Sequence, residues 1–301
     1  MDKKVLITGA NGFIGGKLIQ EIDSLKGFNA VGTDLTEKPG SNYLYHSGDL
    51  SSESFREFLR QKHTYDTVIH LAGSLSKNES PESRRSLFEI NSGITLGMLE
   101  LAHSCSASFI FLSTGLVYGN QPPPFSETMT PLPRSFYAES KLLAEKCIQY
   151  FSDVYKMRSV VFRPSVIYGP GQTGNMFIPS LTNALLQNQK FPMTPGKQKR
   201  DFVYIDDIAN AVKSALTDKE VSGTFNLGSG ESRTLLDVAE TAEKATGKHS
   251  LIQPGSISYR ENEVWEYLLD IKKAGKALKW KPETGIEQGI QKTVDSMKEN
   301  M

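Results

Sequence analysis

Residues 4–16 read KVLITGANGFIGG, and this stretch decides the fold. Its apolar start predicts a strand, and three glycines follow with the spacing G-x-x-G-x-x-G. A strand that turns sharply into a helix needs glycine here, because its backbone N–H groups must approach a pyrophosphate and a Cβ would collide. The stretch therefore predicts a dinucleotide-binding turn. The residues expected at the dinucleotide are Gly9, Gly12, Phe13, Ile14 and Gly15.

A carboxylate ends the second predicted strand. Residues 29–33 read as that strand, and Asp34 follows the glycines by about 20 residues, where it can accept hydrogen bonds from the adenosine ribose. A ribose 2′-phosphate would be repelled by Asp34, and residues 35–37 contain no arginine to receive it. The sequence therefore favours NAD over NADP.

The composition limits the possible partners. The 301 residues include 34 Lys and Arg against 34 Asp and Glu, so no global charge attracts nucleic acid or an anionic membrane. The two cysteines and five histidines show no metal-ligand spacing, and no metal site is expected. The sequence shows neither the pattern of an N-terminal leader nor an apolar stretch of about 18 residues. We therefore expect a cytoplasmic location.

The first half alternates short β-branched runs with amphipathic ones, which is typical of a doubly wound parallel sheet in an α/β fold of the Rossmann type. Helices are expected between the strands, one beginning after Ser51 and Ser52 and another over residues 87–102. The expected strands are 5–8, 30–34, 43–46, 67–72, 109–113 and 159–163.

The residue pattern changes after residue 164, where glycine and proline become frequent and indicate turns. A strand is expected again at 201–205, a helix from Asp206 or Asp207, and a further strand at 224–227. We therefore expect an NAD-binding domain over residues 1–164, with returning segments near 201–228. Residues 165–301 are expected to form a smaller, interleaved α/β region that binds the substrate.

Tyr137 and Lys141 form the second informative pattern. Four positions apart on a helix, they share one face, so the ammonium can lie near the phenol and the ribose of a bound cofactor. A free tyrosine titrates near 10, and a cation at about 4 Å with an effective dielectric near 20 contributes roughly 4 kcal/mol, enough to lower the pKa by about three units. Strand 109–113 ends beside the hydroxyls of Ser113 and Thr114, at the sheet edge where ligands bind in open parallel sheets.

Taken together, these motifs resemble the extended short-chain dehydrogenase/reductase superfamily, in the NAD-dependent epimerase/dehydratase family that acts on nucleotide sugars. The resemblance covers nearly the whole chain. It implies that Tyr137 is the acid/base, that Lys141 holds the ribose and lowers the tyrosine pKa, and that Thr114 bonds the reacting oxygen. His70 is expected to pack at a strand end. Further implied cofactor contacts are Asp49, Leu50, Leu71, Ala72, Gly73, Asn91 and Pro164.

The resemblance also implies how the substrate is held. Asn175, Arg200 and Arg260 match positions that grip a nucleotide diphosphate, for which an arginine fork is well suited. The residues after Arg260, Glu-Asn-Glu at 261–263, depart from the family's usual proline-glycine-aspartate. A homodimer is implied as well, formed by the helices around 87–102 and 137–150.

Three chemistries occur in this branch: 4-epimerisation, reduction of a 4-keto sugar and 4,6-dehydration. Dehydratases need an acid pair directly after the catalytic threonine, and Gly115 and Leu116 stand there. Asp34 favours a redox-neutral epimerase that keeps its NAD. Val166, where epimerases commonly carry asparagine, and the approach to Arg200 through residues 193–196 also fit a 4-ketoreductase of deoxysugars.

The sequence predicts a nucleotide-sugar 4-epimerase that uses NAD, with an NAD(P)H-dependent 4-ketoreductase as the alternative. A regulatory dinucleotide sensor without catalysis would be expected to lose the tyrosine and the lysine. A reductase of steroids or small aldehydes would have no reason to keep the diphosphate-binding residues.

Overall fold

The computed structural model describes residues 2–38, 42–76, 78, 80–173, 176–261 and 263–300. The chain forms two compact units. Unit 1 comprises residues 1–120, 128–163 and 211–225, and unit 2 comprises residues 121–127, 164–210 and 226–301. Each unit is thus built from three separate segments of the chain.

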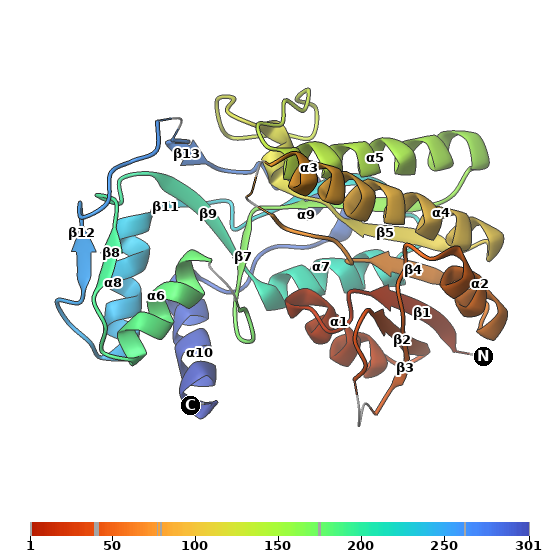
Figure 1. The fold of residues 1–301 in the computed structure, drawn as a ribbon, viewed down its shortest axis with the longest axis horizontal. Coiled ribbons are helices and arrows are strands. Elements are labelled where there is room, and N and C mark those ends of the chain that lie inside the picture. Colours follow the sequence, from red (N-terminus) through yellow and green to blue (C-terminus); the bar gives the residue numbers. More distant parts are fainter. Residues whose placement is uncertain are drawn as a thin grey trace. The chain divides into compact units, whose positions relative to one another are not determined.

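Unit 1 is built on a seven-stranded sheet with the order β10-β6-β5-β4-β1-β2-β3, of which Figure 1 labels β1 to β5. The pairs from β3 to β6 are all parallel, which makes this the predicted Rossmann-type sheet. The strand order reverses beside β1, so the glycine turn that follows β1 lies at the switch point where such sheets bind ligands. The strands are β1 Lys3–Thr8, β2 Phe28–Asp34, β3 Leu44–Ser47, β4 Thr67–His70, β5 Ser108–Leu112, β6 Ser159–Pro164 and β10 Gly223–Leu227.

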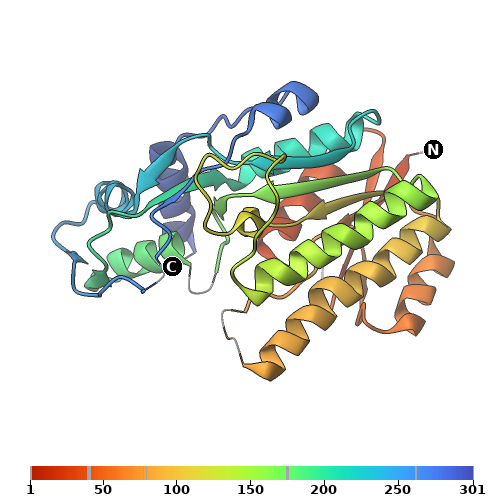
Figure 2. The ribbon, with the colours of Figure 1, turned by 90° about the horizontal axis from the view of Figure 1, so that it is seen from above.

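Helices cover both faces of this sheet, as a doubly wound fold requires. The helices α4 and α5 lie side by side in both views, and α1 is joined to α7 by the ion pair of Glu21 with Lys213 at 2.6 Å (Figure 2). The helices are α1 Phe13–Asp23, α2 Glu53–Lys62, α3 Pro81–Phe88, the π-helix η1 Glu89–Gly93, α4 Ile94–Ser104, the 3₁₀ turn η2 Gly115–Tyr118, α5 Phe136–Tyr155 and α7 Ile205–Thr217.

The predicted elements of unit 1 agree with these bounds within a few residues, with two differences. The helix expected over 87–102 is interrupted by the π-helix η1 over Glu89–Gly93. The helix after Ser51 and Ser52 does begin at Glu53, but the Ser52 side chain does not cap its backbone, because its hydroxyl bonds Ser54 instead.

Unit 2 holds smaller sheets and four helices in its described part. The strands β11, β9 and β13 form one sheet in which β7 also pairs with β9, while β12 pairs with β8. The elements are β7 Val166–Tyr168, α6 Phe177–Leu186, β8 Phe191–Met193, β9 Lys199–Tyr204, β11 Ser232–Thr234, α8 Leu235–Thr246, β12 Ile252–Pro254, β13 Glu266–Tyr267, α9 Lys272–Leu278 and α10 Ile286–Glu299.

Candidate active site

The glycine turn after β1 packs backbone against backbone. Gly9 has φ = +68°, a conformation that strains any residue with a Cβ. A Cβ on Gly15 would lie 2.0 Å from the carbonyl oxygen of Gly9, so glycine alone fits there. Gly12 precedes α1 without a side-chain cap, and the first turn of α1 carries no acidic residue. The N-terminus of α1 is therefore suited to an anion such as a pyrophosphate.

The carboxylate of Asp34 lies beside this turn. One of its oxygens accepts from the backbone N–H of Asn11 at 3.0 Å, and the other accepts from Leu35 N–H at 2.8 Å. The Asn11 side chain in turn donates to the Tyr45 hydroxyl at 2.7 Å. The end of β2 and the glycine turn are thus fastened together, so that the residues present fit the pyrophosphate and the ribose of a dinucleotide.

A buried hydrogen-bond chain holds the end of β4. The Thr8 hydroxyl accepts from the backbone N–H groups of Leu71 and Ala72, each at 3.1 Å, and lies 2.7 Å from Nδ1 of His70. The other ring nitrogen of His70 lies 3.1 Å from the Thr95 hydroxyl. Burial, with the Lys141 charge, lowers the pKa of His70 to about 3. His70 is therefore a neutral packing residue at the strand end, as predicted.

Asn91 is presented by the π-helix η1, and its amide is used inside the chain. Its oxygen accepts from Ser74 N–H at 2.8 Å, and its nitrogen donates to the carbonyl oxygen of Ser74 and to the hydroxyl of Ser140. A Cβ on Gly73 would lie 2.8 Å from that amide oxygen. Asn91 therefore joins the loop after β4 to helix α5, and its contact with a cofactor stays a prediction.

Three further predicted cofactor residues have structural roles in the chain. A hydrogen bond from Ser51 N–H at 2.8 Å lowers the pKa of Asp49, so that this carboxylate orders the turn before α2. The Leu50 side chain is buried in the core, and Pro164 is the last residue of β6. Their contacts with a cofactor also stay predictions.

Tyr137 lies in the first turn of α5, beside the end of β5. The Ser135 hydroxyl caps α5 by accepting from Ala138 N–H, which fixes where the helix begins. Thr114 caps η2 and is hydrogen-bonded to Tyr137. Burial raises the pKa of Tyr137 to about 12, and the bond with Thr114 opposes this rise. The structure thus brings together the predicted tyrosine and threonine.

Lys141 follows one helical turn later and is buried, with 5% of its surface exposed. Its ammonium lies 4.4 Å from the centre of the Phe111 ring. Burial lowers the pKa of Lys141 to about 8, and the charge of Glu145 opposes this. Lys141 does not figure among the groups that shift the pKa of Tyr137, so the tyrosine pKa is raised where the sequence predicted that it is lowered. Desolvation of the phenol is the physical reason for this difference.

An acid that was not predicted from the sequence lies one helical turn after Lys141. Glu145 is buried on α5, where it is paired with Arg163 at 2.6 Å and accepts a hydrogen bond from Ser113. The signal that could have found it is the spacing of four from Lys141, which places both side chains on one helix face.

The predicted diphosphate residues belong to unit 2. Arg200 of β9 donates to Glu263 at 2.5 Å and to the carbonyl oxygen of Val264 at 2.6 Å. Glu263 is one of the residues that depart from the family pattern, and it pairs with the arginine expected to bind phosphate. Arg260 is exposed, and Asn175 lies outside the described residues.

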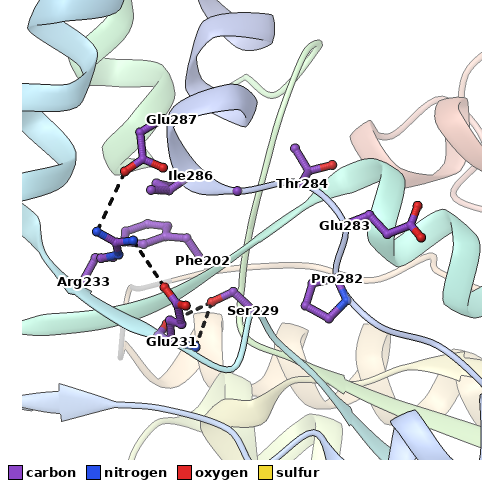
Figure 3. A pocket seen from close by; sticks show the side chains of 10 residues that line it. Phe202, Ser229, Glu231, Arg233, Pro282, Glu283, Thr284, Ile286 and Glu287 are labelled. Carbon is purple, nitrogen blue, oxygen red and sulfur yellow. Dashed lines mark hydrogen bonds and ion pairs between the residues drawn. The ribbon is translucent and has the colours of Figure 1, made fainter.

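Unit 2 also contains a polar pocket (Figure 3), which none of the predicted site residues lines. Arg233 projects between Glu231 and Glu287, at 3.3 and 3.8 Å. Its charge is therefore already balanced, and the pocket is not a strong anion site. The remaining lining residues are Phe202, Ser229, Pro282, Glu283, Thr284, Gly285 and Ile286.

Within the described ranges, no group of three His, Cys, Asp or Glu side chains could hold a metal ion. The helices of the same ranges include none that is long and apolar enough to cross a bilayer.

Known proteins match this chain over nearly its whole length. The chain is 30% identical over 311 residues to dTDP-4-dehydro-6-deoxyglucose reductase of Escherichia coli, covering 98% of this chain and 97% of that protein. The crystal structure of UDP-glucose 4-epimerase from Thermotoga maritima with UDP-glucose matches with a TM-score of 0.91 at 27% identity over 99% of each chain. The UDP-glucose 4-epimerase of Thermus thermophilus in complex with NAD matches with a TM-score of 0.89 at 26% identity, over 99% of this chain and 100% of that one.

A family model matches residues 5–228, which span the glycine turn, the whole of α5 and the last strand of the sheet. The chain belongs to the NAD-dependent epimerase/dehydratase family, as an NAD-dependent enzyme of the extended short-chain dehydrogenase/reductase type whose relatives act on nucleotide sugars.

Proposed function

We propose that this enzyme is an NAD-dependent nucleotide-diphosphate-sugar 4-epimerase that works through a transient 4-keto sugar. The observation that carries the proposal is the carboxylate of Asp34 at the end of β2, beside the glycine turn. This carboxylate would accept hydrogen bonds from the ribose hydroxyls of NAD and would repel the 2′-phosphate of NADP. An enzyme that keeps its NAD is suited to a reaction without net oxidation.

The residues after Thr114 argue against dehydration. Gly115 and Leu116 begin the 3₁₀ turn η2, and neither side chain can transfer a proton. Removal of water from C5 and C6 of a hexose needs an acid and a base at that place. Epimerisation at C4 needs neither, because the proton moves only at the 4-oxygen.

The roles proposed for the site residues follow from their contacts. NAD, when bound, supplies the acceptor of the C4 hydride and returns that hydride to the other face of the sugar. Tyr137 takes the proton of the 4-hydroxyl and gives it back, while Thr114, hydrogen-bonded to Tyr137, holds the reacting oxygen. The ammonium of Lys141 is buried one helical turn from Tyr137, and its proposed role is to hold the ribose of the cofactor.

The substrate is proposed to be a UDP- or dTDP-linked hexose. The named relatives act on such compounds, and the Thermotoga maritima structure holds UDP-glucose. Unit 2 would supply the diphosphate contacts through Asn175, Arg200 and Arg260. The Arg200 guanidinium is paired with Glu263, so a substrate phosphate must either displace Glu263 or bind the guanidinium together with it.

A 4-ketoreductase of a nucleotide-linked deoxysugar is the second candidate. The reductase of Escherichia coli, at 30% identity over nearly the full length, is the observation that favours it. A dinucleotide sensor without catalysis is the weakest candidate, because Thr114, Tyr137 and Lys141 are all kept and the first two are hydrogen-bonded.

Turnover of a substrate panel tests the proposal. The purified enzyme is offered UDP- and dTDP-hexoses without any added reductant, and the products are followed by NMR, with Tyr137→Phe as the inactive control. We expect at least one hexose to be converted to its 4-epimer. Turnover restricted to 4-keto sugars with added NADH or NADPH would establish the reductase, and dinucleotide binding without any turnover would establish the sensor.

We also propose a homodimer and a cytoplasmic location. Large apolar side chains of α4 and α5 are exposed, among them Tyr150, Val154 and Tyr155. A pairing of these helices between two copies would cover them. Light scattering of the native enzyme and of Val154→Glu tests the dimer, and cell fractionation tests the location.

A further inference from the structure

A buried polar network lies behind the proposed catalytic residues, and no step of the reaction uses it. Arg163 donates from Nη2 to Glu145 at 2.6 Å and from Nε to both carboxylate oxygens at 3.1 and 3.2 Å. Nη1 of Arg163 donates to the hydroxyl of Tyr118 at 2.9 Å, and the Ser113 hydroxyl donates to Glu145. All four side chains are buried, with Glu145 8% and Arg163 6% exposed.

Stability alone is a poor reason for such a network. The loss of hydration of two buried charges often exceeds their attraction, and apolar side chains of the same volume frequently stabilise a fold equally well. The network does satisfy every one of its members, so it is rigid and gives a defined geometry. The position of the network in the fold indicates which side chains it orients.

The network contacts the proposed catalytic residues from two directions. Ser113 immediately precedes Thr114, and Tyr118 ends the turn η2 that Thr114 caps. Glu145 lies on α5 one turn after Lys141 and two turns after Tyr137. Glu145 and Arg163 therefore join both flanks of Thr114 to the helix that carries the tyrosine and the lysine.

We infer that Glu145, clamped by Arg163, is a positioning residue that holds the Thr114 hydroxyl in register with Tyr137 and Lys141. The inference rests on the proposed function only in that its kinetic test uses the 4-epimerase assay. A displacement of about 1 Å at reacting groups can lower a rate by about 100-fold, so rigidity at this place has a large effect.

The same carboxylate acts on the charge of Lys141. The ionisable members of the network besides Glu145 are Arg163 on β6 and Tyr118 on η2, and the segment after β5 contributes the neutral Ser113. Lys141 on α5 interacts with the charge of Glu145 and with the buried, neutral His70 on β4. Burial lowers the pKa of Lys141 to about 8, and the negative charge of Glu145 opposes that effect. Removal of this charge leaves the burial effect unopposed and moves the lysine pKa below its present value.

Glu145→Gln is the principal test. It keeps the shape and removes the charge, whereas Asp153→Asn makes the same change at an exposed site on the same helix. We expect Glu145→Gln to lower kcat by about 10- to 100-fold while KM and the affinity for NAD change by less than about threefold. The alkaline limb of the kcat profile should move to lower pH. Asp153→Asn should match the native enzyme.

Two further variants separate geometry from charge. Glu145→Asp keeps the charge but shortens the reach, so it should restore the alkaline limb and leave kcat low. Ser113→Ala removes one hydrogen bond and leaves the ion pair intact, so it folds even if Glu145→Gln does not, and kcat should fall by about 3- to 10-fold. A native kcat in Ser113→Ala, or losses in Glu145→Gln that only follow the folded fraction, would overturn the inference.

A measurement without turnover keeps this inference distinct from the proposed function. NMR of isotope-labelled lysine gives the Lys141 pKa directly in the native enzyme and in Glu145→Gln. A lower pKa in the variant supports the effect of Glu145 even if no hexose is epimerised. An unchanged pKa in an enzyme that does epimerise would refute the effect on charge and leave the proposed function intact.

Discussion

At the scale of single residues, the site contains two ionisable side chains whose charged forms are destabilised by burial. Lys141 is buried with a pKa lowered to about 8, and Tyr137 is partly buried with a pKa raised to about 12. In both residues, burial favours the neutral form. The sequence could predict that Tyr137 and Lys141 share one helix face, because both lie on α5 with a spacing of four. It could not predict the pKa directions, since these depend on how much water the packing removes.

Lys141→Met should therefore stabilise the enzyme while it abolishes activity. Below pH 8 the lysine is charged in both states, and the shift of its pKa from 10.5 corresponds to a penalty of about 3 kcal/mol, reduced slightly by the Phe111 contact. Between pH 8 and 10.5 the unfolded chain binds more protons, so native stability rises with pH and the difference between the two proteins disappears.

Urea unfolding at pH 7 and at about pH 10.5 measures this difference. Lys146→Met is the matched control, because Lys146 is exposed on the same helix and should change stability by less than about 0.5 kcal/mol at either pH. A Lys141→Met variant that is less stable than the native enzyme at pH 7 would refute the burial argument.

At the scale of elements, the glycine turn before α1 combines close backbone packing with a helix N-terminus that suits an anion. The sequence predicted strand, turn and helix here, because glycine spacing is a local signal. The π-helix η1 was not predicted, since its extra residue leaves the apolar pattern almost unchanged and its purpose, the contacts of Asn91 with Ser74 and Ser140, lies in distant segments.

Gly15→Ala and Gly16→Ala should behave in opposite ways. A Cβ on Gly15 would lie 2.0 Å from the Gly9 carbonyl oxygen, so α1 must shift, and we expect a loss of at least about 2 kcal/mol together with NAD affinity. On Gly16 the nearest atom would be 3.9 Å away, so alanine should stabilise α1 by about 0.5–1 kcal/mol. Thermal unfolding and NAD titration of both variants check this, and equal behaviour of the two would contradict it.

At the scale of the whole molecule, the chain runs repeatedly between its two units. The sequence predicted segments that return to the first domain, because the strand pattern reappears at 224–227. Residues 121–127 belong to unit 2 through pairings such as Phe125 with Leu268, which no local pattern indicates.

A fragment of residues 1–164 should not fold by itself. It lacks strand β10 and the buried side chains Ala211, Val212 and Ala215 of α7, and Glu21 loses its ion pair with Lys213. We expect no cooperative urea transition by circular dichroism, whereas the full chain should show one. A monomeric fragment that unfolds cooperatively and binds NAD would show that unit 1 does not need its later segments.

The fate of the C4 hydrogen distinguishes a 4-epimerase that keeps its hydride on bound NAD from the other candidate enzymes. A hexose that the panel identifies is prepared with deuterium at C4 as its UDP or dTDP derivative and incubated with the enzyme and NAD in ordinary water. We expect the 4-epimer with the deuterium still at C4, because the same hydride leaves and returns. Loss of the label from C4, or conversion of only a 4-keto sugar when NADH or NADPH is added, would contradict it.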